Sequence, residues 1–468
     1  MKGTPILAAL LLAAVADGGA GAEVGWRYLC SADGAMPPPN AGKEQTACLV
    51  LDIDKDRVSD FVITERTQAP AVVWYKFNGR AADPKWARYV IEREPLHIEA
   101  GGDFADLDGD GDLDIVFSGD WKSDGVWWWE NPCPDFQPET PWRRHTIKSG
   151  DGARQQHDCR LGDFDGDSRI ELAWWSQSAK KLFLGRIPKD PRTAPSWPYA
   201  AIFSYSGKLG HEGLDVADIN LDGKPDIVGA GLWFEHQGGD RFAAHPIADR
   251  PFTRTAVGQL VAGGRPEVVL SPGDADGPID WYQWDGAAWV AHRLLDKVVH
   301  GHSLQVADID GDGHLDVFSG EMGQPGAGPA CQTRIFWGDG RGGFRAETIA
   351  VGKANHESRL ADLDGDGRLD ILGKPYSFQT PILHVWLQRR PAPFGNAQHA
   401  THLMALHKLS LDPSDASSCD VIGCADRSGR VACASNAGAV AQLPSTTGRG
   451  ARGEGGAVKV RGLRPESL

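Results

Sequence analysis

The chain has little of what membrane-spanning, nucleic-acid-binding or long-helical proteins need. Beyond its first residues no apolar run approaches the 18 residues of a membrane helix, so we expect no membrane span in the mature protein. The formal net charge of −15 is the opposite of the basic surplus that phosphate binding requires, which argues against a nucleic-acid partner. The 58 glycines and 30 prolines favour many turns over long helices.

The N-terminus carries a targeting pattern. The stretch MKGTPILAALLLAAVADGGAGA has one early lysine, an apolar run of moderate length and the small residues Ala20 and Ala22 near its end. This pattern is typical of a secretory signal, so we expect a signal peptide over 1–22 and a secreted or periplasmic mature protein. The spacing of the eight cysteines does not fix their pairing, although Cys30 with Cys48 is one candidate disulfide.

Clusters of acidic residues recur between apolar runs. In VADIDGDGHLDVFSG, residues 306–320, four aspartates stand at offsets 0, 2, 4 and 8. Because like charges this close repel, and because unpaired carboxylates near a core are costly, a bound cation is the simplest explanation. Acid loops of this type start at Asp52, Asp106, Asp163, Asp218, Asp308 and Asp362.

The spacing of the acid loops predicts the architecture. Their starts are 54, 57, 55, 90 and 54 residues apart, and the long interval contains the degenerate copy VGQLVAGGRPEVVL. In that copy Gln259, Val261 and Gly263 replace the acids and only Glu267 remains, so the fifth unit is expected to be free of metal. Seven units of roughly 50 residues, each with four short strands, predict an all-β, seven-bladed propeller over 24–390.

The last unit is incomplete in sequence. It stops after its third strand, near Gln388, and a match to a fourth strand, WRYL, lies at residues 26–29. We expect the two ends to share the seventh blade, because closing the ring removes exposed strand edges. Tryptophans recur in the third strands and are expected to fill the space between blades, whereas Trp121 falls in a connection. Residues 391–468 lose this pattern and are expected to be a low-complexity, disordered tail.

The loops DLDGDGDLDIV, DIDGDGHLDVF and DLDGDGRLDIL resemble those of the FG-GAP or VCBS repeat proteins, whose propellers resemble the head of integrin alpha chains. The resemblance covers 24–390 and implies that each acid loop joins the innermost strand to the second strand and binds calcium. The residues themselves also favour calcium, a hard cation with six to eight oxygen ligands whose loop needs a sharp bend at the sixth position. Arg57 and Ser168 replace glycine at this bend, which makes the first and third loops weaker candidates.

The expected calcium ligands come from units two, three, four, six and seven, and we expect these sites to be structural. They are Asp106, Asp108, Asp110, Asp114, Asp163, Asp165, Asp167, Asp218, Asn220, Asp222, Asp226, Asp308, Asp310, Asp312, Asp316, Asp362, Asp364, Asp366 and Asp370.

Histidines mark the other end of the innermost strands. His157, His302 and His356 each lie six residues before the first aspartate of their loop, and His211 lies seven before it. A strand that ends at an acid loop begins on the opposite face, so we expect these imidazoles at one mouth of the channel. There they would bind zinc, act as acid and base, or simply pack blade against blade. Connections between second and third strands are expected to border the same mouth with Asp120, Trp121, Lys122, Glu321, Lys374 and Tyr376.

Two functions fit this pattern, and the fold does not choose between them. The first is a calcium-binding interaction module for carbohydrate or protein ligands. The second is a carbon–oxygen lyase acting on carbohydrate, a dehydratase or polysaccharide lyase, whose acid–base or metal-binding groups would be His157, His211, His302, His356, Tyr376 and Lys374.

The second function draws on two family resemblances. The stretches VWWWENP and HSLQVADIDGDGHLDVFSGEMG resemble the propeller part of fungal aldos-2-ulose dehydratases, which implies a zinc pocket. The cupin-like portion of that family has no counterpart in this chain. The layout, without a local motif, is also similar to that of ulvan-lyase-type enzymes. Whether the protein is an enzyme, and which oligomeric state it adopts, stay open at this point.

Overall fold

The computed structural model describes residues 24–80, 82–389, 424–425 and 431–432. The predicted signal peptide and nearly all of the predicted tail lie outside these residues. Within them the regular structure is β, apart from three short helical turns, η1 (Ser31–Asp33), η2 (Gly323–Ala327) and η3 (Gly328–Ala330). None of the described helices is long and apolar enough to cross a membrane.

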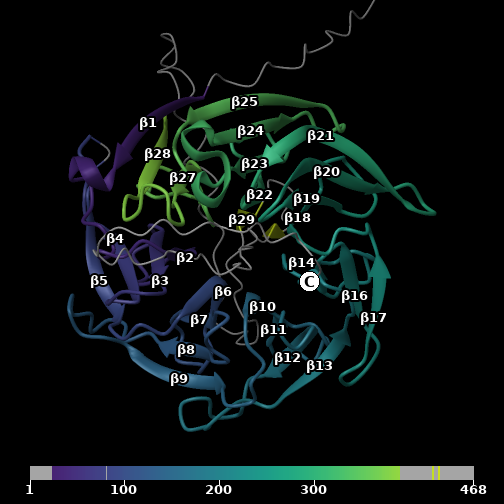
Figure 1. Cartoon of the computed structure of the whole chain (residues 1–468), viewed down its shortest axis with the longest axis horizontal. Helices are drawn as coiled ribbons and strands as arrows, with labels where there is room; N and C mark the ends of the chain where they lie inside the picture. The colour runs from purple at the N-terminus through teal and green to yellow at the C-terminus, as the bar shows by residue number, and fades with distance from the viewer. Residues whose placement is uncertain (1–23, 81, 390–423, 426–430, 433–468) are drawn as a thin grey trace, which may run out of the picture.

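Seven four-stranded antiparallel sheets are arranged as blades around a central axis (Figure 1). Blades one to three contain β2 (Gln45–Leu51), β3 (Asp60–Glu65), β4 (Val72–Phe77), β5 (Trp86–Glu92); β6 (Ile98–Ala105), β7 (Asp114–Gly119), β8 (Val126–Glu130), β9 (Arg143–Lys148); and β10 (Gln156–Gly162), β11 (Glu171–Ser176), β12 (Lys181–Arg186), β13 (Tyr199–Ser204). Blades four to six contain β14 (Asp215–Ala217), β15 (Asp226–Gly229), β16 (Leu232–His236), β17 (Phe242–Pro246); β18 (Thr253–Gly258), β19 (Glu267–Pro272), β20 (Asp276–Trp284), β21 (Trp289–Val299); and β22 (Ser303–Ala307), β23 (Asp316–Gly320), β24 (Gln332–Gly338), β25 (Phe344–Val351). Strands β6, β10, β14 and β22 lie nearest the centre of the ring, and β9, β13, β17 and β25 form its outside (Figure 1).

The seventh blade joins the two ends of the propeller, as predicted. Its strands are β26 (Arg359–Ala361), β27 (Asp370–Gly373), β28 (His384–Arg389) and the N-terminal β1 (Gly25–Cys30). β1 pairs antiparallel with β28, with Trp26 opposite Gln388 and Leu29 opposite Val385. The prediction that WRYL supplies the fourth strand is therefore confirmed. One further strand pair, β29 (Cys424–Ala425) with β30 (Val431–Ala432), falls within the predicted tail.

The core consists of the faces between neighbouring blades. The third-strand tryptophans are at most 7% exposed in the six blades where we expected them, at Trp74, Trp128, Trp233, Trp281, Trp337 and Trp386. Burial of such large side chains stabilises a propeller because each blade buries its apolar faces only against its neighbours. Trp121 is the exception, 39% exposed in its connection.

Cys30, Cys48, Cys133, Cys159 and Cys331 are free thiols. The candidate pairing of Cys30 with Cys48 is therefore wrong. Cys30 instead donates a hydrogen bond from Sγ to Asp33 Oδ2 at 3.0 Å, and Cys48 is fully buried in the interface between blades seven and one.

Candidate functional sites: the acid loops and the channel mouth

Each acid loop folds around its first aspartate. In blade six the backbone N–H groups of Asp312 and Gly313 donate to Asp308 Oδ1 and Oδ2, both at 3.0 Å. The last acid, Asp316, accepts the N–H groups of Ile309 at 2.8 Å and Gly338 at 2.9 Å, which ties the loop to the third strand. Gly313 has φ +93°, so the residue at the bend adopts the left-handed conformation that glycine favours.

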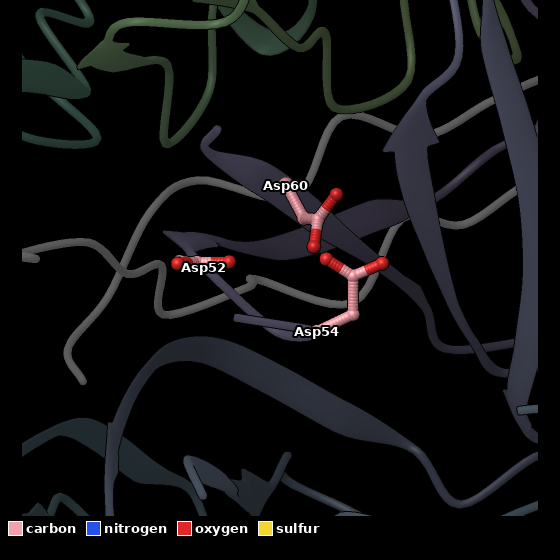
Figure 2. Close-up of side chains that lie close together, drawn as sticks. All are labelled: Asp52, Asp54 and Asp60. Atoms are coloured by element: carbon pink, nitrogen blue, oxygen red, sulfur yellow. The ribbon is translucent and has the colours of Figure 1, made fainter. Parts of the chain in front are cut away.

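The same arrangement recurs around the ring and brings carboxylates together. Figure 2 shows the loop of blade one, where the carboxylates of Asp54 and Asp60 turn toward each other and Asp52 lies beside them. Among the described residues, five groups of this kind have ligand atoms within 4.8 Å of one another: Asp52, Asp54 and Asp60; Asp106, Asp108 and Asp114; Asp163, Asp165 and Glu171; Asp308, Asp310 and Asp316; and Asp362, Asp364 and Asp370. Glu171 and the blade-one group were absent from our predicted ligand set.

These groups fit a divalent cation. Asp54 Oδ1, Asp60 Oδ1 and Asp364 Oδ1 are buried oxygens without a hydrogen-bond donor in the described part of the chain. Burial raises the pKa of Asp114 to about 8 and that of Asp316 to about 7, because desolvation penalises the charged carboxylate. A bound cation reverses this penalty, and an all-oxygen donor set with a left-handed bend is the chemistry that calcium prefers.

Blades four and five depart from the pattern in different ways. Blade four keeps the loop shape, since Asp222 and Gly223 donate backbone hydrogen bonds to Asp218 at 3.0 and 2.8 Å, although Asn220 replaces one acid. In blade five the Gln259 side-chain amide donates to the carbonyl oxygens of Val261 at 2.6 Å and Gly263 at 3.1 Å. An amide N–H thus lies inside this loop where the other loops have acidic oxygens.

The opposite ends of the innermost strands carry a polar cluster that we call the mouth cluster. Its members are His157, His302, His356, Glu99, Glu212, Asp274, Lys374 and Tyr376, with the arginines paired to its acids. His157, His302 and His356 are each 0% exposed and stand at the register position six residues before their loops. Strand β22 separates His302 from Asp308 by five residues, so the mouth cluster and the acid loops lie on opposite faces, roughly 20 Å apart.

Four of the predicted mouth residues lie together. The rings of His302 and His356 stack with centroids 4.7 Å apart, and Tyr376 lies 5.1 Å from His356. Lys374 Nζ is 3.0 Å from His356 Nδ1 and also donates to the carbonyl oxygens of Gln45 at 2.9 Å and Thr46 at 2.8 Å. Burial lowers the pKa of Lys374 to about 7 and places those of both histidines well below their usual value.

His211 lies apart from this group, and Glu212 takes its place. The His211 ring stacks on Tyr205 with centroids 3.6 Å apart and meets Trp175 edge-on at 5.2 Å. Glu212 is the residue six before Asp218, in register with the other three histidines, and it is fully buried. A β-carbon at Gly273 would stand 2.2 Å from Glu212 Oε1 and 3.3 Å from His302 Nε2, so Glu212 and His302 approach the same point.

Buried ion pairs surround these residues. Arg66 binds Glu99 at 2.7 Å, Arg254 binds Asp158 at 2.9 Å, and Arg359 binds Glu357 at 3.1 Å, and all six side chains are at most 2% exposed. We had not predicted Glu99, Arg66, Arg254 or Asp274 as members of the site. Their only sequence signal is a charged residue beside or inside an apolar strand, which is a weak one.

Several carboxylate oxygens of the mouth cluster accept no hydrogen bond among the described residues. Within the described part of the chain no hydrogen bond reaches either oxygen of Glu212, nor Glu99 Oε2, Glu357 Oε1 or Asp274 Oδ1. Burial raises the pKa of Glu99 to about 8 and that of Glu212 well above its usual value. The cluster meets solvent at His97, whose side chain is 35% exposed, and at Trp121, which follows the buried Asp120.

The mouth cluster forms no compact metal-ligand group in the described residues. The clusters of three or more acidic, histidine or cysteine ligands within 4.8 Å are the acid loops. His302 Nε2 lies 3.6 Å from Asp274 Oδ1, and His157 Nε2 lies 3.9 Å from Glu99 Oε2, so these histidines pair with separate carboxylates. The predicted zinc site gains no support from this geometry.

Comparison with known proteins supports the repeat assignment. Residues 106–174, 163–229 and 264–319 match the model of the FG-GAP-like repeat. The chain therefore carries FG-GAP-like repeats in a seven-bladed propeller. No curated protein matches its sequence.

Several solved structures are similar to the chain at low identity. The Tc holotoxin pore of Photorhabdus luminescens shares 14% identity at a TM-score of 0.31, over 71% of this chain and 17% of that one. AofleA from Arthrobotrys oligospora shares 13% identity at a TM-score of 0.37, over 70% and 91%. The V. cholerae biofilm matrix protein Bap1 shares 13% identity at a TM-score of 0.32, over 76% and 63%. Function must therefore come from the residues of this chain.

Proposed function

We propose that this protein is a calcium-stabilised binding module that holds a neutral, hydroxyl-rich carbohydrate at the channel mouth. The observation that carries the proposal is a set of buried carboxylate oxygens in the mouth cluster that accept no hydrogen bond, on Glu212, Glu99 and Asp274. Buried acceptors without donors are costly, so a ligand that brings several O–H donors is bound favourably there. Sugar hydroxyls supply such donors without adding negative charge to an already acidic cluster.

The surroundings of the cluster suit a sugar. Trp121 exposes 39% of its surface beside the cluster, and an exposed indole is a suitable face for the apolar side of a pyranose ring. The nearby ammonium of Lys122 lies 4.7 Å from the Trp121 ring and keeps it ordered. The ion pairs of Arg66 and Arg254 hold the carboxylates of the cluster in place before the ligand arrives.

The acid loops supply the stability of the module. Extracellular modules bind calcium with dissociation constants of about 10⁻⁴ to 10⁻³ M. At about 1 mM calcium, each such site contributes roughly 0.4 to 1.4 kcal/mol by mass action. Export, which the N-terminal pattern suggests, would place the protein where calcium is this abundant.

A carbohydrate-binding screen tests the proposal. Isothermal titration against a panel of neutral and uronic-acid oligosaccharides should find binding to a neutral member. Glu212→Gln should weaken that binding about tenfold or more, since leaving a buried polar group of the complex without its partner costs about 1–3 kcal/mol. Asp296→Asn, on the outer strand β21 with a side chain 93% exposed, is the matched control and should bind as the wild type does. Binding of no glycan, or of acidic glycans in preference, would overturn the proposal.

A second candidate function is elimination from a uronic-acid sugar, as in polysaccharide lyases. The observation that favours it is Lys374, whose pKa of about 7 is suited to a general base and which lies beside His356. The base would take the proton next to the sugar carboxylate, a carbon–carbon double bond would form as the bond to the leaving oxygen breaks, and the protonated base would return the proton to that oxygen, which departs as an alcohol. All three ammonium donors of Lys374 are already bound within the protein, which weighs against this role. Release of unsaturated products from the uronic-acid panel would establish it.

A further inference from the structure

One third-strand position faces the last acid of every loop, and we call it the facing position. In blade three Arg186 lies directly opposite Glu171 in the strand register. By the same register the facing position is Lys76 in blade one, Glu235 in blade four and Gln283 in blade five. The charge at this position therefore differs from blade to blade, while the loops are near copies.

In blade one the facing position is occupied by a base. Lys76 Nζ contacts a carboxylate oxygen of Asp54 and lies 2.7 Å from Asp56 Oδ2. These are the third and fifth positions of the loop, beside the carboxylate pair that Figure 2 displays. The lysine ammonium thus already neutralises part of the charge that a calcium ion would use.

Blade three repeats this contact with a different base. Arg186 Nη2 lies 3.1 Å from Asp165 Oδ2, again the third loop position, and its Nη1 binds Asp240 at 2.7 Å. Both blades with a base at the facing position therefore direct it to the same aspartate of the loop.

Blade four has the opposite charge at this position. Its third loop residue is Asn220, which lacks a carboxylate, and Asn220 Nδ2 lies 3.3 Å from Glu235 Oε1. Glu235 thus places a negative charge beside Asn220, the loop position that has no carboxylate in this blade. The pairing of Asn220 with Glu235 mirrors the pairing of Asp54 with Lys76.

We propose that the facing position tunes the calcium affinity of blades one, three and four, lowering it where Lys76 or Arg186 stands and raising it where Glu235 stands. The inference rests on the proposed binding of calcium by the loops. A unit charge about 6 Å from a divalent ion changes its affinity about tenfold even at the dielectric constant of water. Glu235 would compensate for Asn220 in blade four. In blades two and seven Arg192 and Arg389, which stand at other positions, contact the third loop aspartates Asp108 at 2.7 Å and Asp364 at 2.6 Å, so the proposal does not extend to those blades.

Two charge reversals test the inference in opposite directions. Calcium titrations of the whole protein, by isothermal calorimetry and by competition with a chromophoric chelator, give both the number of ions and their affinities. Lys76→Glu should strengthen one site at least about tenfold, and Glu235→Lys should weaken one site by at least the same factor. Calcium-dependent shifts of the unfolding temperature should change in the same directions.

Blade five provides the matched control. Gln283 occupies the facing position over a loop whose ligand positions are Gln259, Val261 and Gly263, so Gln283→Glu and Gln283→Lys should leave the titration unchanged. If a reversal prevents folding, Lys76→Gln and Glu235→Gln should give the same directions at smaller size. Wild-type protein that binds no calcium would refute the proposed calcium binding itself. Calcium binding that Lys76→Glu and Glu235→Lys leave unchanged would refute only the role of the facing position.

Discussion

The two faces of the propeller follow different rules. On the loop face the same backbone pattern recurs, so that Asp308, Asp218 and Asp362 each accept the N–H group of the glycine at the bend at 2.8 to 3.0 Å. On the mouth face the residue six before the loop varies more, since Thr46, Ala100, Glu212 and Thr253 stand in register with His157, His302 and His356. Repetition on one face and variation on the other distinguish the shared loop scaffold from the chemistry of the mouth.

The difference teaches where specificity resides in a repeat protein. A loop that closes each blade in the same way can be copied with its blade, since its partners lie within that blade. The mouth cluster at the axis draws residues from several blades, so the copies can diverge and each provide a different part of it. The mouth cluster combines fixed ion pairs with unsatisfied carboxylates, and these two kinds of group should respond differently to substitution.

The largest expected effect is the loss of a fixed ion pair at the mouth. Arg254→Met leaves Asp158 buried without its cation, and breaking a buried pair in this way costs about 3–5 kcal/mol. Chemical unfolding should show this loss with calcium present or absent. If the loss of stability caused by Arg254→Met disappeared once calcium is removed, the two faces would not be independent.

A loop substitution should cost less and depend on calcium. Asp316→Ala removes the acceptor for the N–H groups of Ile309 and Gly338, and we expect a loss of about 1–3 kcal/mol. Thermal unfolding with calcium and with a chelator should show a larger loss when calcium is present, because the site is lost as well. Equal losses under both conditions would contradict a metal role for this loop.

The pH dependence of the calcium-free protein sharpens the contrast further. Burial raises the folded-state pKa of Asp114 and Asp370 to about 8 and that of Asp226 to about 7, while unfolded aspartate titrates near 3.9. Between about pH 4 and pH 8 the folded state therefore holds more protons than the unfolded state, and stability falls as pH rises. Unfolding temperatures measured over this window should decline without calcium and stay flatter with it. If the unfolding temperature of the calcium-free protein rose with pH instead, these carboxyl groups would not be buried acids without a cation.

The smallest effect on stability is expected at the unsatisfied carboxylate. Glu212→Gln replaces a buried carboxyl group that accepts no hydrogen bond among the described residues by a neutral amide of similar shape, so the free energy of unfolding should stay within about 0.5 kcal/mol or increase. Denaturant titration measures this, and the sugar titration described above measures the accompanying loss of affinity. A large destabilisation would show that Glu212 serves the fold instead of a ligand.

Much of the loop face was predictable from sequence, and much of the mouth was not. The loop spacing predicted seven blades, and the WRYL match at residues 26–29 predicted the shared seventh blade, because both rest on local, repeated patterns. The mouth cluster is assembled across the axis, so Glu99 and Arg254 carry no local signal of their partners. His211 illustrates the limit: a shift of one residue in register places it on Tyr205 and leaves Glu212 in the ring of histidines.

The most direct test of the division between faces is the number of calcium ions bound per chain. Protein equilibrated by dialysis against about 1 mM calcium, a concentration near the affinity of extracellular sites, should contain at least four ions by elemental mass spectrometry. Glu212→Gln should contain the same number, since the mouth cluster takes no part in binding them. Absence of calcium, or its loss in Glu212→Gln, would contradict the separation of a metal-stabilised scaffold from a ligand-binding mouth.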